Sequence, residues 1–208
     1  MKKLLHIIAT PRGEASRTLR VSRAFLEGVT TKYPACVIDE LNLFKETLPP
    51  LTVERIDGKY ALLSGKELSG NSRKAWEAIL RQIERFLAAD GYLISVPMWN
   101  FSIPYVLKHY LDVIVQPRYL FRYTPNGPEG LVKDRKMVIV TSRGGDYSAA
   151  PANSMDLQEP YLKAVLGLVG IKDLTFVNVQ PMDALGPQVR DEKIAAACEA
   201  VRKLAGNL

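Results

Sequence analysis

The apolar positions along the chain fall into two kinds of segment. Short apolar runs with little polar alternation are typical of strands buried on both faces of a parallel sheet. Between them, apolar residues recur every three or four positions, as they do on one face of a helix. The strand-like runs are Lys3–Ala9, Cys36–Leu43, Gly91–Val96, Met137–Ser142 and Leu174–Val179, and the helical stretches start at Ser16, Leu68, Ile103, Pro160 and Gln188. This alternation predicts an α/β fold.

The order of these elements predicts a single domain over residues 1–208, built on an open, doubly wound, five-stranded parallel sheet with helices on both faces. The element count matches the flavodoxin-like strand order 2-1-3-4-5. Two segments stand outside the alternation. Lys45–Gly65 is rich in proline and glycine and is expected to be a long connection with a short helical piece. Tyr119–Tyr123 and Leu131–Val132, separated by Pro125–Gly127, are expected to form a hairpin.

Composition narrows the class of protein further. Of the 208 residues, 47% are hydrophobic, which allows a sizeable core and disfavours disorder. No apolar run is long enough to cross a bilayer, and the N-terminus lacks the pattern of a secretory signal, so we expect a cytoplasmic protein with no membrane partner. Cys36 and Cys198 match no metal or redox spacing, and we expect two free thiols and no metal site.

The formal net charge of +6 raises the question of a nucleic-acid partner. The basic residues are dispersed, however, and acidic residues such as Glu77 and Glu84 lie between Lys74, Arg81 and Arg85 on one predicted helix. No run of five like charges occurs. The sequence therefore predicts a mildly basic, solvated surface that suits an anionic small ligand and no nucleic-acid partner.

The predicted topology locates the chemistry before any motif is considered. In an open parallel sheet, ligands bind beyond the carboxyl ends of the strands, where the strand order reverses. This rule selects the three loops Thr10–Thr18, Pro97–Ser102 and Ser142–Tyr147. The first loop offers the hydroxyls of Thr10, Ser16 and Thr18 at the start of a helix.

A helix start of this kind favours an anion. The first loop has neither the lysine of a GxxxxGK[ST] loop nor the glycines of GxGxxG, so neutral donors that hold a phosphomonoester are the remaining interpretation, with Arg17 adding charge. The alternative is that Ser16 is only the N-cap of the helix.

The second loop is unusually apolar for a segment that follows a buried strand. Apolar and aromatic surfaces of this kind cover the faces of a flat ring, while loop amides reach its polar edge. The alternative is that the aromatic side chains fold back onto the core. The residues of this loop are Pro97, Met98, Trp99, Asn100 and Phe101.

The third loop contains Ser142, Arg143, Gly144 and Gly145. Adjacent glycines let the backbone approach a ligand closely and present N–H groups to negative charge on a reduced ring. The alternative is a simple tight turn.

With these loops, the chain resembles the bacterial FMN-dependent NADH:quinone oxidoreductases, also called FMN-dependent NADH-azoreductases, over essentially its whole length. Three motifs carry the resemblance: Pro97–Phe101 followed by Ile103 and Pro104, then Phe121–Gly130, then Thr141–Gly145. The resemblance implies tightly but non-covalently bound FMN.

In that family resemblance, each loop takes one part of the cofactor. The phosphate is implied at Thr10 and Ser16–Thr18, and the isoalloxazine ring and ribityl chain at Met98–Phe101, with Pro97 beside them. Ser142–Gly145 is implied at the polar edge of the ring.

The resemblance also implies a ping-pong reaction in which NADH or NADPH reduces FMN and leaves before a quinone or azo compound takes its place. No side chain need be catalytic, because the flavin carries the electrons. A homodimer is implied, with both FMN sites at its interface and with Tyr119, Phe121 and Tyr147 as candidate contacts to substrate. The alternatives are an FMN-binding electron carrier without substrate turnover and a regulatory scaffold of the same fold.

Overall fold

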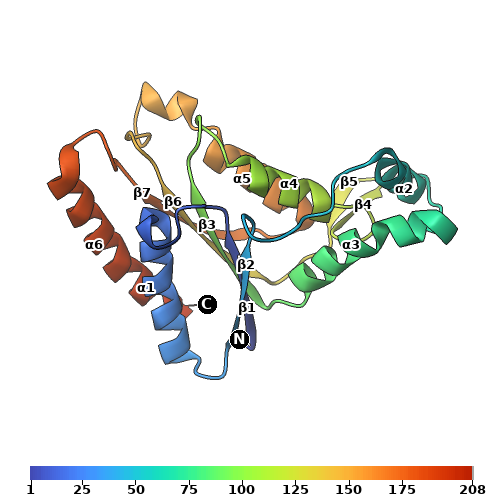
Figure 1. Cartoon of the computed structure of the whole chain (residues 1–208), viewed down its shortest axis with the longest axis horizontal. Helices are drawn as coiled ribbons and strands as arrows, with labels where there is room; N and C mark the ends of the chain where they lie inside the picture. Colours follow the sequence, from blue (N-terminus) through green and yellow to red (C-terminus); the bar gives the residue numbers. More distant parts are fainter. Residues whose placement is uncertain (208) are drawn as a thin grey trace.

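The five apolar runs form one parallel sheet in the computed structural model, which describes residues 1–207. The strand order is β2-β1-β3-β6-β7 (Figure 1). When the two hairpin strands are left out of the numbering, this is the predicted order 2-1-3-4-5. The strands are β1 (Lys3–Ile8), β2 (Val37–Asn42), β3 (Gly91–Pro97), β6 (Lys136–Ser142) and β7 (Asp173–Val179).

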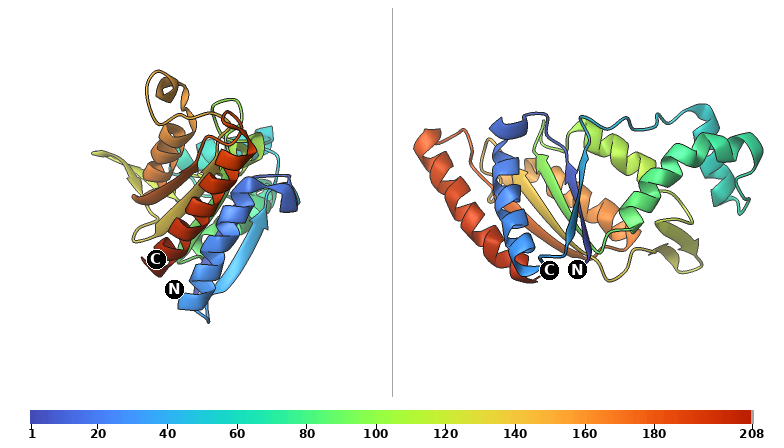
Figure 2. Two further views of the ribbon diagram at one scale, coloured as in Figure 1. Left: turned by 90° about the vertical axis from the view of Figure 1, so that its left-hand side faces the viewer. Right: turned by 60° about the horizontal axis from the view of Figure 1, so that its bottom comes forward.

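Helices cover both faces of this sheet (Figures 1 and 2). Successive strand residues point to opposite faces, so Leu93 belongs to one core cluster and Ile94 to the other. One face packs against α1 (Arg17–Lys32) and α6 (Gly186–Leu204), and the other against α3 (Gly70–Leu87), α4 (Tyr105–Ile114) and α5 (Gln158–Val169).

The expected long connection after β2 contains a full helix, α2 (Val53–Leu63). Gly58 lies within this helix and allows close packing without breaking it. A Cβ atom at Gly58 would lie 2.2 Å from Nε1 of Trp76, and that nitrogen donates a hydrogen bond of 2.9 Å to the carbonyl oxygen of Arg55. Only glycine lets the indole of α3 approach α2 this closely.

The second strand of the hairpin starts earlier in the chain than the sequence pattern indicates. It pairs β4 (Phe121–Thr124) with β5 (Gly127–Gly130), so the prediction that Leu131–Val132 is the second strand was wrong. The short turn places Thr124 opposite Gly127, which has a left-handed φ of 105°. Because β5 consists of glycine, proline and glutamate, it shows no apolar alternation that would predict a strand.

An ion-pair cluster ties the edge strand β2 to the rest of the molecule. Asp39 accepts a hydrogen bond of 2.6 Å from Nη2 of Arg85 and lies 2.9 Å from Nζ of Lys3. Its side chain is 19% exposed, so solvent screens these contacts only in part. The hydrogen bond from Arg85, and secondarily the one from Lys3, holds the pKa of the Asp39 carboxyl below its usual value.

Asp39→Asn is expected to lower the free energy of unfolding at pH 7 by about 2 kcal/mol, because charged hydrogen bonds are lost. The folded-state pKa lies below the unfolded value of about 3.9, so this stabilisation is present above pH 4 and disappears as the pH falls through the folded-state pKa. Urea unfolding of both proteins between pH 7 and pH 3 measures the difference. A difference that stays constant across that range would contradict this account.

Candidate active site

Three loops meet at the carboxyl edge of the sheet and enclose one cavity of about 140 Å³. They follow β1, β3 and β6, the central strands of the sheet, as the topology rule requires. A fourth segment, which connects β7 to α6, completes the wall. The lining residues are Thr10, Arg12, Ser16, Arg17, Thr18, Pro97, Met98, Trp99, Ser142, Arg143, Gly144, Met182 and Asp183.

One end of the cavity is built from neutral hydrogen-bond donors at the start of α1. Oγ of Ser16 accepts a hydrogen bond of 3.3 Å from the N–H of Leu19, so its own proton is free to be donated. The backbone N–H groups of Arg17 and Thr18 have no acceptor within residues 1–207. Ser16 is therefore an N-cap and at the same time a donor to the cavity.

Other hydroxyls extend this set. Oγ1 of Thr10 accepts a weak contact of 3.5 Å from the N–H of Arg12, and Oγ1 of Thr18 pairs with Oγ of Ser142 at 2.7 Å. Free N–H groups, hydroxyl protons and the positive end of a helix converge on one small volume. This donor set fits the oxygens of a phosphomonoester.

The second loop is a two-residue turn in a left-handed backbone conformation. Trp99 and Ser102 exchange two backbone hydrogen bonds of 2.9 Å, and the central residues Asn100 and Phe101 have φ angles of 47° and 68°. Such conformations cost about 1–2 kcal/mol for each residue that is not glycine. The N–H of Leu157 donates to the carbonyl oxygen of Phe101 at 3.0 Å and secures the turn from outside.

The aromatic side chains of this turn do not fold back onto the core. Trp99 is 37% exposed and Phe101 is 43% exposed. The ring of Phe44 lies 6.1 Å from that of Trp99, and the ring of Tyr147 lies 6.3 Å from that of Phe101. The polar cavity therefore opens beside an aromatic surface, which we call the aromatic rim: Phe44, Trp99, Phe101 and Tyr147.

Beyond the hydroxyl of Ser142, the third loop contributes backbone rather than side chain. Arg143 is 2% exposed, and its guanidinium turns away from the cavity to donate a hydrogen bond of 2.8 Å to Asp156. The carbonyl oxygen of Gly144 accepts from three successive N–H groups of the β7–α6 segment, at 3.1, 3.0 and 3.3 Å. Neither Gly144 nor Gly145 has a left-handed φ, so their small size matters here and not their conformational freedom.

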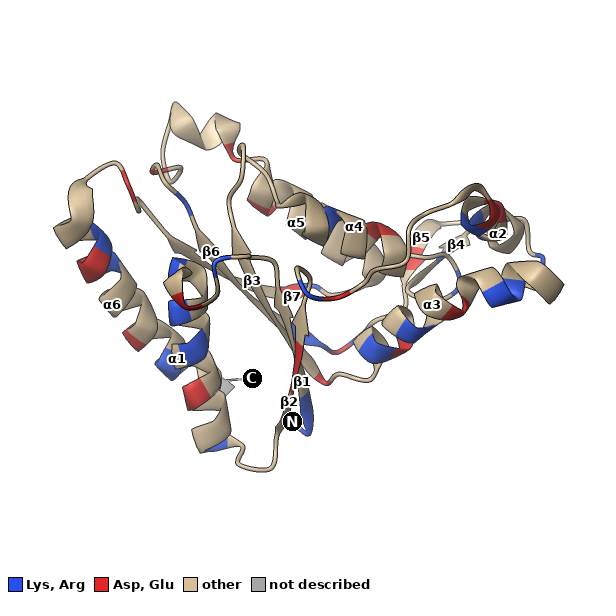
Figure 3. Ribbon diagram, in the orientation of Figure 1, with Lys and Arg blue, Asp and Glu red and all other residues tan. Residues whose placement is uncertain are grey.

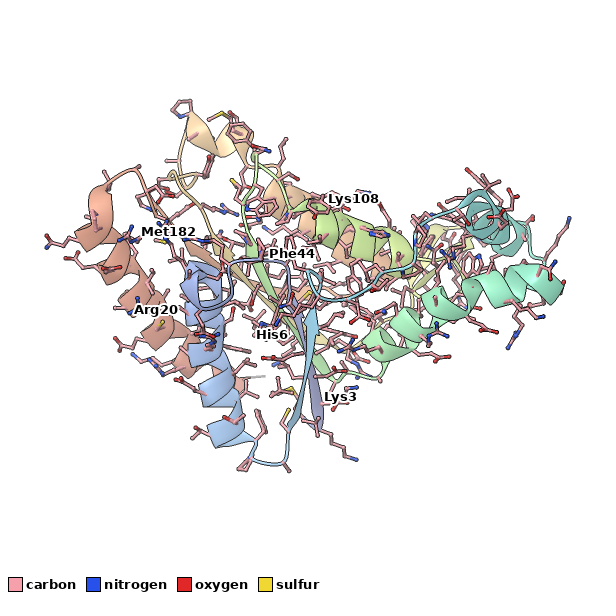
Figure 4. The ribbon with its side chains drawn as sticks, viewed as in Figure 1. Lys3, His6, Arg20, Phe44, Lys108 and Met182 are labelled. Carbon is pink, nitrogen blue, oxygen red and sulfur yellow. The ribbon has the colours of Figure 1, made fainter. Side chains whose placement is uncertain are left out.

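Two lining residues, Met182 and Asp183, lie outside the three loops selected from the sequence, and Arg12 lies within the first loop but was not among the predicted cofactor contacts. Nη1 of Arg17 contacts Oδ1 of Asp183 at 2.6 Å and the carbonyl oxygen of Met182 at 3.3 Å. Figure 4 shows Met182 beside the first turn of α1. The sequence could have indicated Met182 and Asp183, because they follow the fifth parallel strand, which also ends at this edge of the sheet.

Other predicted residues lie outside the cavity. Phe101 and Tyr147 belong to the aromatic rim, Asn100 precedes Phe101 in the turn, and Gly145 lies beside the ring of Tyr147. Tyr119 and Phe121 do not reach the crevice of their own chain.

Tyr119, just before the hairpin, and Phe121, its first residue, are instead held within the chain. The ring of Tyr119 packs 6.5 Å from that of Trp76, and Phe121 is 6% exposed. On the same hairpin, Tyr123 is 68% exposed.

The surface carries both signs of charge, interleaved along α1, α3 and α6 (Figure 3). None of the helices in residues 1–207 has the length and hydropathy that a membrane span requires. Within the same residues, no three His, Cys, Asp or Glu side chains gather where they could hold a metal ion. Both cysteines are free thiols.

Comparison with known proteins agrees with this geometry. Residues 2–205 match the model of a family described as having a flavodoxin-like fold. The FMN-dependent NADH:quinone oxidoreductase of Nitratidesulfovibrio vulgaris is 39% identical over 206 residues, which cover 99% of each chain.

Solved structures give the same result. An azoreductase from Bacillus anthracis strain Sterne superposes with a TM-score of 0.90 at 31% identity over 100% of both chains. An FMN-dependent NADH-azoreductase from Bacillus anthracis strain Ames Ancestor, in complex with FMN, superposes with a TM-score of 0.85 at 30% identity over 99% of this chain and 100% of that one. The chain belongs to the flavodoxin-like family of FMN-dependent NADH:quinone oxidoreductases and is an oxidoreductase.

Proposed function

We propose that the crevice binds FMN non-covalently and that the protein uses it to transfer two electrons from NADH or NADPH to quinones and azo compounds. One observation carries the proposal: a small polar cavity at a helix N-terminus opens directly beside an exposed aromatic rim. Its 140 Å³ is less than the roughly 300–1,000 Å³ of sites that enclose a whole ligand. It suits the phosphate end of FMN and leaves the flat ring outside, against the rim.

Each loop then has a distinct task. Thr10, Ser16 and the free N–H groups of Arg17 and Thr18 hold the phosphate. Met98 and the turn through Phe101 lie along the ribityl chain and one face of the ring, and the locked turn fixes the position of that face. The backbone N–H groups of Gly144 and Gly145 are the donors that this loop offers to the polar edge of the ring, because the N–H of Arg143 already donates to the carbonyl oxygen of Val179 at 3.1 Å. Preorganised donors of this kind stabilise negative charge without reorganising.

When FMN is bound, it supplies the redox chemistry and passes two electrons from donor to acceptor. Nicotinamide and acceptor would both stack on the aromatic rim and would use it in turn, which is a ping-pong cycle. A second copy of the chain would shield this surface from water. We propose such a homodimer, in the cytoplasm, with the β4–β5 hairpin and its exposed Tyr123 as a contact to the partner's site.

Purification followed by a dye assay tests the proposal. We expect a yellow protein that releases FMN on denaturation and bleaches methyl red or reduces menadione when NADH or NADPH is added. Bound FMN without turnover would instead indicate an electron carrier. A colourless protein that takes up no added FMN would contradict the proposal outright. Steady-state rates with the two nicotinamides, at matched acceptor concentration, establish the preferred donor.

A further inference from the structure

A carboxylate lines the phosphate end of the cavity, where an anion is to be bound. Asp183 comes from the β7–α6 segment, and its Oδ1 lies 2.6 Å from Nη1 of Arg17. Arg17 is the first residue of α1, so its side chain starts beside the free N–H groups at that helix N-terminus. The only side-chain partner of this guanidinium within residues 1–207 is therefore already an anion from the same chain.

The backbone of Asp183 is fixed in this place. Its N–H donates 3.0 Å to the carbonyl oxygen of Gly144, and the N–H groups of Met182 and Ala184 donate to the same oxygen. Its Oδ2 lies 3.3 Å from the position that a Cβ of Gly144 would occupy. The side chain is 63% exposed, however, so the carboxylate can rotate into solvent once Arg17 is drawn elsewhere.

We propose that Asp183 is an affinity-determining residue that competes with the phosphate of FMN for Arg17. This inference rests on the proposed function of the crevice. In the cofactor-free protein, Arg17 is neutralised by Asp183. When FMN binds, the guanidinium must leave the carboxylate or be shared with it, so part of the attraction to phosphate is offset by the broken ion pair. Riboflavin has no phosphate and meets no such competition.

The test compares two ligands across a double-mutant cycle of Asp183→Asn and Arg17→Gln. FMN and riboflavin are titrated into cofactor-free protein, and binding is followed by quenching of flavin fluorescence. We expect Asp183→Asn to tighten FMN binding by a factor of about five, the upper range for exposed ion pairs, and to leave riboflavin binding unchanged. With Arg17→Gln already present, the exposed carboxylate has no cation to hold it in the cavity, and the same substitution should change FMN affinity by less than about twofold.

Asp191→Asn provides the matched control. Asp191 is 62% exposed and also pairs with an arginine, Arg190, but it lies on α6 outside the cavity. Asp191→Asn removes the same charge as Asp183→Asn and is expected to leave the affinities for FMN and for riboflavin unchanged. Melting temperatures of all variants show whether the fold is intact.

Two results would overturn the inference. One is FMN binding by Asp183→Asn that is no tighter than in the wild type. The other is an equal gain with and without Arg17, which would indicate through-space repulsion and not competition. The proposed function fails separately, by a wild-type protein that binds neither flavin, so the two failures are distinguishable.

Discussion

Ser16→Asp is expected to weaken FMN binding severely while leaving the fold intact. Aspartate is as good an N-cap as serine, and a negative charge at a helix N-terminus is favourable, so α1 should remain stable. The same charge would face the dianionic phosphate. At about 4 Å and an effective dielectric constant of about 20, each pair of unit charges is repelled by about 4 kcal/mol. FMN affinity should fall by at least roughly a hundredfold.

Fluorescence titration with FMN and with riboflavin, together with thermal unfolding, measures this outcome. Ser16→Asn is the matched control, because asparagine has nearly the same shape as aspartate and also caps the helix but carries no charge. We expect it to weaken FMN binding by less than about tenfold, as a neutral hydrogen bond contributes about 1 kcal/mol. If Ser16→Asp bound FMN as tightly as Ser16→Asn, the phosphate would lie elsewhere.

The site is predictable from sequence to the extent that it follows from topology. Continuous apolar runs identify β1, β3 and β6, and parallel strands must end at one edge, so the convergence of their loops follows before any contact is known. Chain order alone then predicts that the hydroxyls of Thr10 and Ser16 lie where these loops converge, and both residues line the cavity.

What sequence could not predict depends on contacts between distant segments. The buried guanidinium of Arg143 turns toward Asp156 because the α5 start happens to supply a carboxylate there. The left-handed turn at Asn100 and Phe101 is secured by a hydrogen bond from the N–H of Leu157, in a distant segment, to the carbonyl oxygen of Phe101. Asp183 reaches the cavity only because its segment is bonded to Gly144.

Gly130→Ala is expected to cost more stability than Asp39→Asn. A Cβ at Gly130 would lie 2.2 Å from the backbone nitrogen of Gly170 and 2.4 Å from its Cα. These are main-chain atoms at the end of α5, where Gly170 holds a left-handed φ of 102°, so no side chain can move aside. The hairpin must separate from α5, at a cost of about 3 kcal/mol, typical of overpacking.

For a chain of this length, about 3 kcal/mol corresponds to a fall in melting temperature of roughly 6–12 °C. Gly167→Ala is the control on the same helix, because a Cβ there meets no atom within 4 Å. It should leave stability unchanged or raise it by up to about 1 kcal/mol, since alanine favours the helix. Gly130 lies by the first residues of β6 and β7, while the cavity of the same chain lies at their carboxyl ends, so the substitution does not touch the loops that line that cavity. Equal melting temperatures for the two variants would show that the hairpin does not depend on close backbone packing at Gly130.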